Sequence, residues 1–573
     1  MNDSTATAPR GADATALLEH AAAWLTQDPD GETRAELRGI ITAVESGDAA
    51  ATVDLADRFN GRLAFGTAGL RGELGAGSNR MNRVLVSQAA AGLAAYILEK
   101  AAPDADADLA PMVVIGYDGR RNSDVFARDS AELFAGAGLR AMLLPRMLPT
   151  PVLAFAVRAL GAAAGVMVTA SHNPPNDNGY KVYLGGESDG SQIVAPADAE
   201  IAAHIQRVAD TTAVGALPRS LAVETAPESL IDAYVAATAT VATAPRGAEG
   251  MRWVYTAMHG VGWETLSRVL DAAGYPAPTP VNAQLEPDGT FPTVAFPNPE
   301  EPGAMDLAFE AARASDAELV IANDPDADRL AVAIPDPTAQ GYWRRLSGNE
   351  IGLLLGWRAA KNASGIDGES LACSLVSSPA LGAVAEHYHL DFHTTLTGFK
   401  WISRAPGMIY GYEEALGYLV NPGTVRDKDG ISAAVAMLSM AAEARGDGKT
   451  ISDLLAEFGE TFGWFASDQV SIRVDDVSTI AHIMSALRAE HPTKIAGTAV
   501  VRVDDLLAGV DSFPSGDVLR FWLDDGSRVI VRPSGTEPKL KAYLDVRSDS
   551  REAADERVAT VAKSVRKLFA KLS

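Results

Sequence analysis

The sequence predicts an α/β protein built from several domains. Short apolar runs alternate with segments of helical periodicity, as in the predicted strand Met112–Tyr117, the helix Ser123–Ala137 and the strand Ala162–Val168. The length of 573 residues corresponds to roughly three to five domains at about 100–200 residues each. The composition is 47% hydrophobic and 21% charged, which is typical of a globular protein that buries sizeable cores.

The charge balance bears on possible partners. The formal net charge is −25, which argues against nucleic acid and anionic membranes, because both bind basic surfaces. Cys373 is the only cysteine, so a disulfide framework and a cysteine-rich zinc site are excluded and a reducing compartment is expected. Residues 1–13 lack the pattern of a signal peptide, and we find no uninterrupted apolar run of transmembrane length. We therefore expect a cytoplasmic protein.

The order of predicted elements divides the chain into a helical extension and four blocks. The first three blocks alternate strands and helices, and their similar size suggests an internal repeat, although no clear sequence period is present. The fourth has short, partly exposed strands and ends in an amphipathic helix, Arg551–Leu572, which is typical of an α+β domain. The predicted boundaries are 1–50 for the extension, then 51–220, 221–345, 346–466 and 467–573.

A loop that carries Ser171 follows the strand Ala162–Val168. Asn173, two prolines and the run Asn176–Gly179 exclude regular structure there, and a second strand, Tyr180–Leu184, leaves the loop. In α/β enzymes, catalytic groups lie on loops at strand ends. A serine in a loop is usually only a turn residue, so its meaning depends on the rest of the chain.

Three carboxylates directly follow the apolar strand Glu318–Ala322. They are Asp324, Asp326 and Asp328. Carboxylates this close repel unless a cation lies among them, and oxygen ligands favour Mg²⁺ or Ca²⁺. An EF-hand would need glycine and glutamate where this chain has Arg329 and Pro335, and a helix instead of the preceding strand. A solvated acidic turn remains the alternative, but Pro325 and the flanking apolar strands favour a fixed geometry.

The metal site suggests a role for Ser171. Mg²⁺ bound by three aspartates readily adds a phosphate oxygen, and Arg329 could bind another. Ser171 lacks the Gly-x-Ser-x-Gly context of an acyl-transfer nucleophile, and only His172 adjoins it. A covalent phosphate on Ser171 would complete the metal site, and the metal would spread charge from the transferring group.

Other loops could bind a phosphorylated sugar. Arg532–Lys539 offers a guanidinium, two hydroxyls and turn N–H groups for a phosphate. Glu413 and Glu414, predicted between a strand and a helix, could accept hydrogen bonds from sugar hydroxyls or could simply start the helix. Three further loops contain glycine and cationic side chains: Phe65–Gly72 around Arg71, Thr397–Lys400, and Arg426–Gly430.

Four of these motifs occur in the order found in the α-D-phosphohexomutase superfamily, which the chain resembles from about residue 60 to its end. The motifs are Thr169–Pro174, Asp324–Arg329, Glu413–Gly417 and Arg532–Thr536. Asn178–Tyr183 and the form of Glu413–Gly417 are most similar to the branch that contains phosphopentomutase and glucose-1,6-bisphosphate synthase. Bacterial members of this branch are often called phosphoglucomutase or phosphomannomutase.

The resemblance implies three related mixed α/β sandwich domains and a C-terminal α+β domain similar to the TATA-binding protein, around a central cleft. Ser171 would carry the phosphoryl group, with His172 beside it. Lys181 and Arg71 match positions assigned to acid–base work. One Mg²⁺ would be bound by the phosphoserine at Ser171 and by Asp324, Asp326 and Asp328. Ligand-contacting positions would be Arg329, Lys400, Glu413, Arg532, Ser534, Gly535 and Thr536.

The implied reaction is a phosphosugar mutase. Phosphoserine 171 would phosphorylate a sugar monophosphate, the bisphosphate would turn round, and Ser171 would take back the other phosphate. A closed cleft would exclude water, which requires the fourth domain to move. The implied partners are a small sugar phosphate and an activating sugar bisphosphate, with no nucleic acid or membrane, in a monomer or homodimer.

One departure bears on the substrate. Glucose and mannose mutases usually have serine two residues after the sugar-binding glutamate, where this chain has Ala415. A hexose substrate interconverted between its 1- and 6-phosphates, a pentose substrate, and the synthesis of glucose 1,6-bisphosphate all remain open. A haloacid-dehalogenase phosphatase would need an early Asp-x-Asp nucleophile motif, whereas Asp324 lies mid-chain. A non-catalytic sugar-phosphate sensor would be expected to lose Ser171 or a metal aspartate, and all are present.

Overall fold

The computed structural model describes residues 11–66, 69–101, 110–474, 478–510, 513, 515–533 and 539–572. The chain forms two compact units. The first unit contains the residues up to Arg344 and returns for Asn421–Ser439. The second unit contains Arg345–Val420 and the residues from Met440 onward.

The first unit begins with three helices, as the helical periodicity of this stretch predicts. They are α1 (Gly11–Gln27), α2 (Gly31–Glu45) and α3 (Ala49–Phe59). Asp30 and Asp48 cap α2 and α3 by accepting hydrogen bonds from the free backbone N–H groups of the first turn. Trp24, Leu37 and Phe59 are buried in a small core of their own. This core lies against the start of α4 (Arg83–Ala101), so the helices are attached to the following domain.

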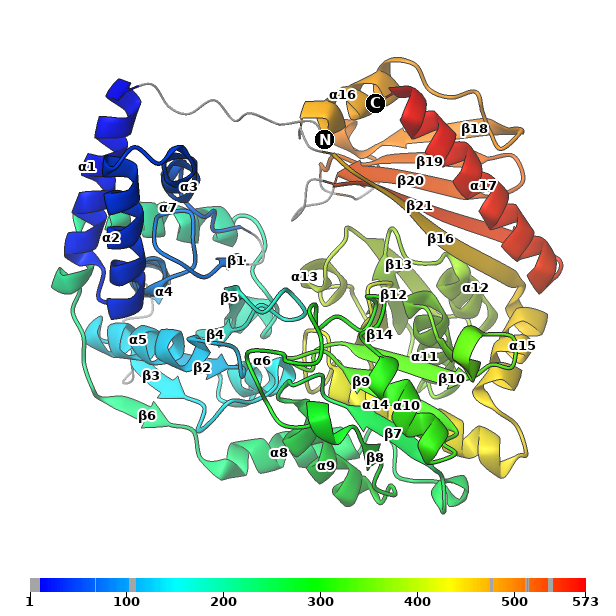
Figure 1. Cartoon of the computed structure of the whole chain (residues 1–573). Coiled ribbons are helices and arrows are strands. Elements are labelled where there is room, and N and C mark those ends of the chain that lie inside the picture. The colour runs from blue at the N-terminus through cyan, green and yellow to red at the C-terminus, as the bar shows by residue number, and fades with distance from the viewer. Residues whose placement is uncertain are drawn as a thin grey trace. The chain divides into compact units, whose positions relative to one another are not determined.

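A six-stranded mixed sheet in the first unit carries the Ser171 loop (Figure 1). Its order is β1-β5-β4-β2-β3-β6, in which β2, β3, β4 and β6 run parallel and β5 is antiparallel to β4. Apolar residues of α4, α5 and α7 pack in one core with these strands. The elements are β1 (Leu70–Glu73), β2 (Met112–Tyr117), α5 (Ser123–Gly136), β3 (Arg140–Leu143), α6 (Thr150–Ala159), β4 (Ala164–Val168), β5 (Asp177–Leu184), α7 (Ala197–Thr211) and β6 (Val223–Thr225).

A five-stranded sheet in the same unit carries the aspartate loop. Its order is β11-β10-β9-β7-β8, with β7 and β9 parallel and fully buried. The elements are α8 (Glu228–Ala239), β7 (Trp253–Thr256), α9 (Gly262–Ala273), β8 (Thr279–Pro280), α10 (Asp306–Ala314), β9 (Leu319–Asn323), β10 (Leu330–Pro335) and β11 (Trp343–Arg345). The returning segment Asn421–Ser439 includes the start of α14 (Gly430–Gly446).

The second unit contains a four-stranded sheet of order β13-β12-β14-β15, whose first three strands are parallel. Its β14 and β15 form an antiparallel hairpin. A capping box at Ser347 and Glu350 starts the helix that follows β11. The elements are α11 (Gly348–Lys361), β12 (Ser370–Ser374), α12 (Ala380–His387), β13 (Asp391–Thr395), α13 (Phe399–Ile402), β14 (Met408–Glu413), β15 (Gly417–Leu419) and α15 (Ile451–Phe462).

The C-terminal part of the second unit is a sheet of order β16-β21-β20-β19-β18-β17 in which every pairing is antiparallel (Figure 1). The long helix α17 and the shorter α16 pack their apolar residues against it, which gives the α+β arrangement predicted for this block. The elements are β16 (Trp464–Arg473), α16 (Ser478–Ala489), β17 (Lys494–Ile495), β18 (Thr498–Asp505), β19 (Leu519–Leu523), β20 (Arg528–Pro533), β21 (Lys539–Ser548) and α17 (Arg551–Leu572).

One local prediction needs correction. The strand after the Ser171 loop begins at Asp177 rather than Tyr180, because Leu70–Glu73 of β1 pairs with Asp177–Tyr180 and supplies a partner for the polar residues. In the described residues, α4 has the length and mean hydropathy of a membrane span, with Ser87 and Gln88 interrupting its apolar residues. However, 67% of its apolar window is buried within the fold, as is usual for the core helix of a domain.

Candidate active site

Ser171 lies at the carboxyl end of β4 with its hydroxyl held by an aspartate. Its Oγ donates a hydrogen bond to Asp324 Oδ2 at 2.6 Å, and the residue is only 2% exposed. Its backbone N–H donates to Thr169 Oγ1 at 2.8 Å. The φ angle of Ser171 is 51°, a left-handed conformation that costs a non-glycine residue about 1–2 kcal/mol. Such strain is typical of residues whose conformation is imposed by function.

The three aspartates predicted to bind metal form one buried cluster after β9. Each can offer an oxygen so that the three atoms lie within 4.8 Å of one another. All three residues are fully buried, and Oδ1 of both Asp326 and Asp328 has no hydrogen-bond partner. A buried carboxylate oxygen without a partner is costly, and a divalent cation would satisfy it. These residues therefore fit a Mg²⁺ ion.

Two lysines balance the charge of this cluster. Lys181 Nζ, on β5, donates to Asp326 Oδ2 at 2.7 Å and to Asp328 Oδ2 at 2.8 Å. Burial by itself would lower the pKa of Lys181, but the two carboxylates raise it overall. Lys428 Nζ lies 3.0 Å from the same Asp328 oxygen. Lys428 was not among the predicted site residues, although the cationic loop Arg426–Gly430 was noted.

The returning segment brings Lys428 to the cluster through several polar contacts within the first unit. Tyr183 donates a hydrogen bond to Asp427 at 2.8 Å, and Tyr234 donates to both carboxylate oxygens of Asp429 at 3.0 Å. Asp429 also accepts from backbone N–H groups at the start of α14. Sequence position alone assigns this segment to the third block, so only the folded chain shows that it lies beside the aspartates.

The pKa values of the three aspartates shift in different directions. Burial and the two neighbouring carboxylates raise the pKa of Asp324 well above its usual value. Burial also acts to raise the pKa of Asp326, but the Lys181 ammonium lowers it overall. For Asp328, lysines 181 and 428 likewise outweigh burial and the charge of Asp326. The Ser171 hydroxyl therefore lies beside one carboxylate with a raised pKa and two with lowered pKa values.

The other predicted groups of the first unit lie around Ser171. His172 Nδ1 is 3.3 Å from Ser171 Oγ, and burial followed by the charges of Arg329 and Arg71 keeps its pKa well below the usual value, so the imidazole is neutral. Arg329 donates its backbone N–H to Asp324 Oδ1 at 2.9 Å, and its Nε lies 4.0 Å from Oδ2 of that residue. These contacts group the serine and aspartate motifs in space.

Arg71 differs from its predicted setting. It lies in β1, opposite Gly179 of β5, rather than in the glycine-rich loop, of which Thr67 and Ala68 lie outside the described residues. Its Nη1 donates to Asn173 Oδ1 in the Ser171 loop at 3.2 Å. Burial lowers the pKa of Arg71, while the carboxylate of Asp326 acts against that shift.

The turn at Gly260 and Val261 packs against the backbone of the aspartate loop. The N–H of Val261 donates to the carbonyl of Pro325 at 2.9 Å. A Cβ added at Gly260 would lie 2.4 Å from the Pro325 Cα, so a larger residue would displace the loop. The packing of this turn therefore fixes the backbone of the aspartate loop.

In the second unit, the predicted sugar-binding residue Glu413 ends β14 and is half-buried. The helix predicted after Glu414 is wrong, because the chain turns into β15 and Glu413 pairs with Gly417 in the hairpin. Glu414 has a different role from its neighbour. Its Oε2 accepts hydrogen bonds from Ser374 and Ser377, both at 3.0 Å. Glu414 thus joins the β14–β15 hairpin to the end of β12.

Arg532 lies near the end of β20, opposite Lys541 of β21, and is half-buried. Burial raises the pKa of Tyr543, and the charges of the two glutamates add to this shift, whereas a hydrogen bond from Arg532 opposes it. Arg532, Tyr543 and the glutamate hairpin are therefore neighbours. Lys400 lies in α13 and is also half-buried. Ser534, Gly535 and Thr536 lie outside the described residues.

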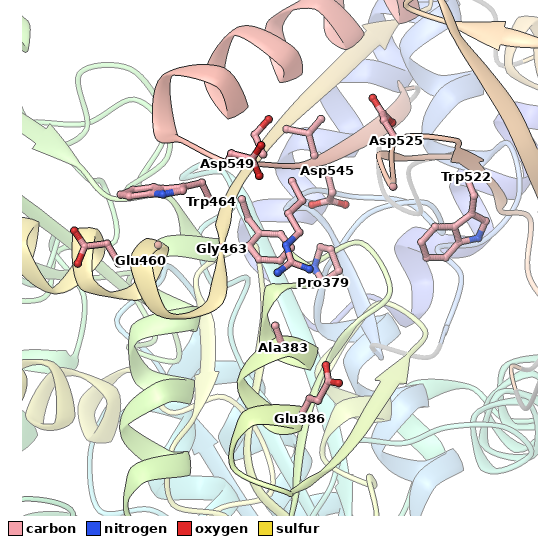
Figure 2. A pocket seen from close by; sticks show the side chains of 16 residues that line it. Pro379, Ala383, Glu386, Glu460, Gly463, Trp464, Trp522, Asp525, Asp545 and Asp549 are labelled. Carbon is pink, nitrogen blue, oxygen red and sulfur yellow. The ribbon is translucent and has the colours of Figure 1, made fainter.

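A separate pocket of about 790 Å³ lies within the second unit (Figure 2). Its lining includes the aromatic residues Trp464 and Trp522 and the carboxylates Glu386, Asp525 and Asp549. None of the predicted site residues lines it. This pocket is therefore distinct from the residues considered above.

The fold and the buried serine–aspartate cluster define a class of phosphoryl-transfer enzyme, and comparison with known families agrees. Four family models match successive parts of the chain, and all four describe phosphoglucomutase/phosphomannomutase. They are the alpha/beta/alpha domains I, II and III, at residues 62–212, 232–338 and 347–462, and the C-terminal domain, at residues 473–563. The chain belongs to the phosphoglucomutase/phosphomannomutase family, and it is an intramolecular phosphotransferase of the isomerase class.

Three curated relatives have names consistent with this family. A protein named probable phosphomannomutase from Haemophilus influenzae is 54% identical over 85% of this chain and 98% of its own. A probable phosphoribomutase from Schizosaccharomyces pombe is 33% identical over 95% of this chain and 96% of its own. A phosphoglucomutase from Staphylococcus epidermidis is 34% identical over 86% and 92%. The names agree on a phosphosugar mutase and differ in the sugar.

Solved structures support the fold. A phosphoglucomutase/phosphomannomutase family protein from Burkholderia thailandensis aligns with a TM-score of 0.67 at 19% identity, over 88% of this chain and 96% of that chain. Parafusin, a phosphoglucomutase from Paramecium in its open form, aligns with a TM-score of 0.64 at 18% identity, over 90% and 95%. The predicted fold, with three α/β domains and a C-terminal α+β domain, is thereby confirmed.

Proposed function

We propose that this mutase moves a phosphoryl group between C1 and C6 of a hexose phosphate, through phosphoserine 171 and a sugar bisphosphate. Glucose phosphates are the first candidates and mannose phosphates the second. The observation that carries the proposal is the 2.6 Å contact between Ser171 Oγ and Asp324, within a cluster that also contains two carboxylate oxygens without partners. This arrangement places a hydroxyl that can carry phosphate beside ligands for a cation that binds phosphate.

In the first step, a free hydroxyl oxygen of the sugar monophosphate forms a bond to phosphorus while the bond between phosphorus and Ser171 Oγ breaks. The hydroxyl proton leaves the sugar, and Oγ ends the step as a neutral hydroxyl. We assign this proton transfer to Lys181 and Arg71. Lys181, whose pKa is raised by its carboxylate partners, is protonated and would donate a proton to Oγ. The ammonium would be restored by the proton that the sugar hydroxyl releases, and Arg71, which contacts the Ser171 loop, would assist by hydrogen-bonding the oxygens between which the proton passes.

Neutral His172 can orient the Ser171 hydroxyl without adding charge. A divalent cation bound by the three aspartates would supply a positive charge that stabilises the transferring phosphoryl group. In the second step, the bisphosphate offers its other phosphate to Ser171, and the same bonds form and break in reverse. If the bisphosphate dissociated before this second step, Ser171 would be left without its phosphate. We therefore propose that added sugar bisphosphate acts as the activator.

The second unit supplies recognition in this proposal. Glu413 would accept hydrogen bonds from sugar hydroxyls, and Arg532 with Ser534, Gly535 and Thr536 would bind the phosphate that is not transferred. Lys400 of this unit would contribute a further ligand contact, and so would Arg329 of the first unit. The work is divided along the chain, with phosphate transfer in 51–220, metal binding in 221–345, sugar recognition in 346–466 and phosphate binding in 467–573.

A pentose phosphate is the second candidate substrate. Two observations favour it: the S. pombe relative is named a phosphoribomutase and matches 95% of this chain, and Ala415 lacks the hydroxyl that hexose mutases usually have near the sugar-binding glutamate. The residues of the first unit would then have the same proposed roles, and only the sugar bound by Glu413 would differ.

A substrate panel tests the proposal. The purified protein is assayed with Mg²⁺ and the matching bisphosphate on glucose 1-phosphate, mannose 1-phosphate and ribose 1-phosphate, and tryptic peptides are examined for phosphate on Ser171. The highest kcat/KM on a hexose phosphate, with phosphate on Ser171, supports the first candidate. A higher value for ribose 1-phosphate selects the second. Turnover without any phosphate on Ser171 would contradict the phosphoserine mechanism.

A further inference from the structure

Arg120, which follows β2, binds the backbone of the loop that carries Ser171. Its Nη2 donates to the carbonyl oxygens of Ser171 and Asn173, both at 2.6 Å. Its Nη1 donates to the carbonyls of Pro174, at 2.8 Å, and Asp177, at 3.1 Å. One guanidinium therefore binds four carbonyl groups within a single loop.

The guanidinium of Arg120 is itself held from two further directions. It is 3% exposed, and its Cζ lies 4.9 Å from the centroid of the Phe291 ring, a cation–π distance. Its Nε lies 3.6 Å from Asp118 Oδ2. Asp118 is itself fixed, because its Oδ1 accepts from the backbone N–H of Arg120 at 3.0 Å and from Ser123 Oγ at 2.7 Å.

The loop has few backbone hydrogen bonds of its own. Asn173 N–H donates to Ala170 and Asp177 N–H to Pro174, both at 3.0 Å, and the two prolines have no N–H group. Ser171 also holds a left-handed φ of 51°. Short loops of this composition adopt many conformations when isolated, so the contacts from Arg120 select one of them.

We propose that Arg120 is a positioning residue for phosphoryl transfer: it holds the 171–177 loop in the conformation that directs Ser171 Oγ to Asp324. Arg120 binds the carbonyl of Ser171 while the hydroxyl of the same residue donates to Asp324, so the backbone and the side chain of the serine are fixed separately. The inference rests on the proposed phosphoserine chemistry and assigns Arg120 no contact with the substrate.

Lysine at position 120 cannot replace the contacts of the Arg120 guanidinium. Arg120→Lys keeps the charge beside Asp118, so the buried carboxylate stays paired, but one ammonium group cannot span four carbonyls as a planar guanidinium does. The variant should therefore fold, but its 171–177 loop should no longer be held in a single conformation. Displacing a reacting group by about 1 Å can cost about 100-fold in rate.

The test measures how fast Ser171 is labelled in a single turnover with a ³²P-labelled sugar bisphosphate, together with kcat, KM and the melting temperature. Arg83→Lys is the matched control, since Arg83 makes a two-point ion pair with Asp129 in the same domain without contacting the loop. We expect Arg120→Lys to lower the labelling rate and kcat by about 100-fold with an unchanged KM, and Arg83→Lys to label at the wild-type rate.

The outcomes separate this inference from the proposed function. Wild-type labelling with an equally fast Arg120→Lys variant overturns the positioning role alone. A wild-type protein that is never labelled on Ser171 overturns both. If Arg120→Lys does not fold, Phe291→Leu replaces it, because this change removes the ring that supports the guanidinium and should slow labelling several-fold; a wild-type rate in Phe291→Leu then overturns the inference.

Discussion

Ser171 and the three aspartates of the first unit differ in burial from the predicted ligand-binding residues of the second unit. Ser171 and the three aspartates are almost fully buried, and the serine already has hydrogen-bond partners. Glu413, Lys400 and Arg532 are half-buried at the ends of their elements. The first set is shielded from solvent, whereas the second set is partly exposed to it.

This difference fits a division between chemistry and recognition. Phosphoryl transfer depends on positioning and on charges fixed in a water-poor environment, which favours burial. In the proposed reaction the sugar phosphate binds in two orientations, and its recognition requires groups that can reach it from solvent. The contrast therefore predicts that substitutions in the first unit lower kcat and that substitutions in the second unit raise KM.

The largest effect is expected for Ser171→Ala. Without the hydroxyl no phosphoserine can form, so mutase activity should fall to background, on the order of 10⁶-fold or more. The variant should keep its melting temperature and its affinity for sugar phosphate, because alanine fits the same space. Ser46→Ala, at an exposed helix end, is the control and should have wild-type kcat. Substantial activity in Ser171→Ala would remove the basis of the comparison.

The next effect concerns the metal. Asp326→Asn should weaken Mg²⁺ binding by at least about 100-fold in calorimetric titration and lower kcat, because it removes a charged ligand while Asp328 still pairs with Lys181. Chelation of the metal should abolish the activity of the wild-type protein reversibly. The control is Asp316→Asn, whose side chain is 95% exposed. Equal Mg²⁺ affinity in Asp326→Asn and wild type would show that the cluster is not the metal site.

A smaller effect on activity is expected in the second unit, and it distinguishes two adjacent glutamates. Glu413→Gln should raise KM by about 10- to 100-fold, the value of a hydrogen bond to a charged group. Glu414→Gln weakens the bonds from Ser374 and Ser377, so it should lower the melting temperature instead. Steady-state kinetics and thermal unfolding measure both. A lower kcat with normal KM in Glu413→Gln would contradict the recognition role.

The smallest effect on activity is expected in the N-terminal helices. Phe59 is 6% exposed and packs edge-on against Trp24 with ring centroids 5.8 Å apart. Phe59→Ala should lower the free energy of unfolding by about 3–5 kcal/mol and leave kcat per folded molecule unchanged. Leu221→Ala, at a side chain that is 86% exposed, should change stability by less than about 0.5 kcal/mol. A loss of kcat in Phe59→Ala would assign these helices a direct part in catalysis.

The sequence predicts the architecture well because strands that are buried on both faces are continuous apolar runs. The run 319–322 in β9 is an example, and the aspartates that follow this strand form the cluster that their spacing predicts. The helix expected after Glu414 was wrong, because acidic residues after a strand are equally compatible with a tight turn. The Gly417–Leu419 strand is too short to carry a strong periodic signal.

The sequence by itself determined which chemical groups this protein has: a serine in a polar loop, three alternating carboxylates and several cationic loops. These are local features, set by residue type and by the φ and ψ preferences of glycine and proline. Only the tertiary structure decided which groups meet. Lys428 reaches Asp328 from 100 positions along the chain, and Arg120 reaches the Ser171 carbonyl across 51. Such contacts depend on sheet order and chain return, which no local pattern specifies.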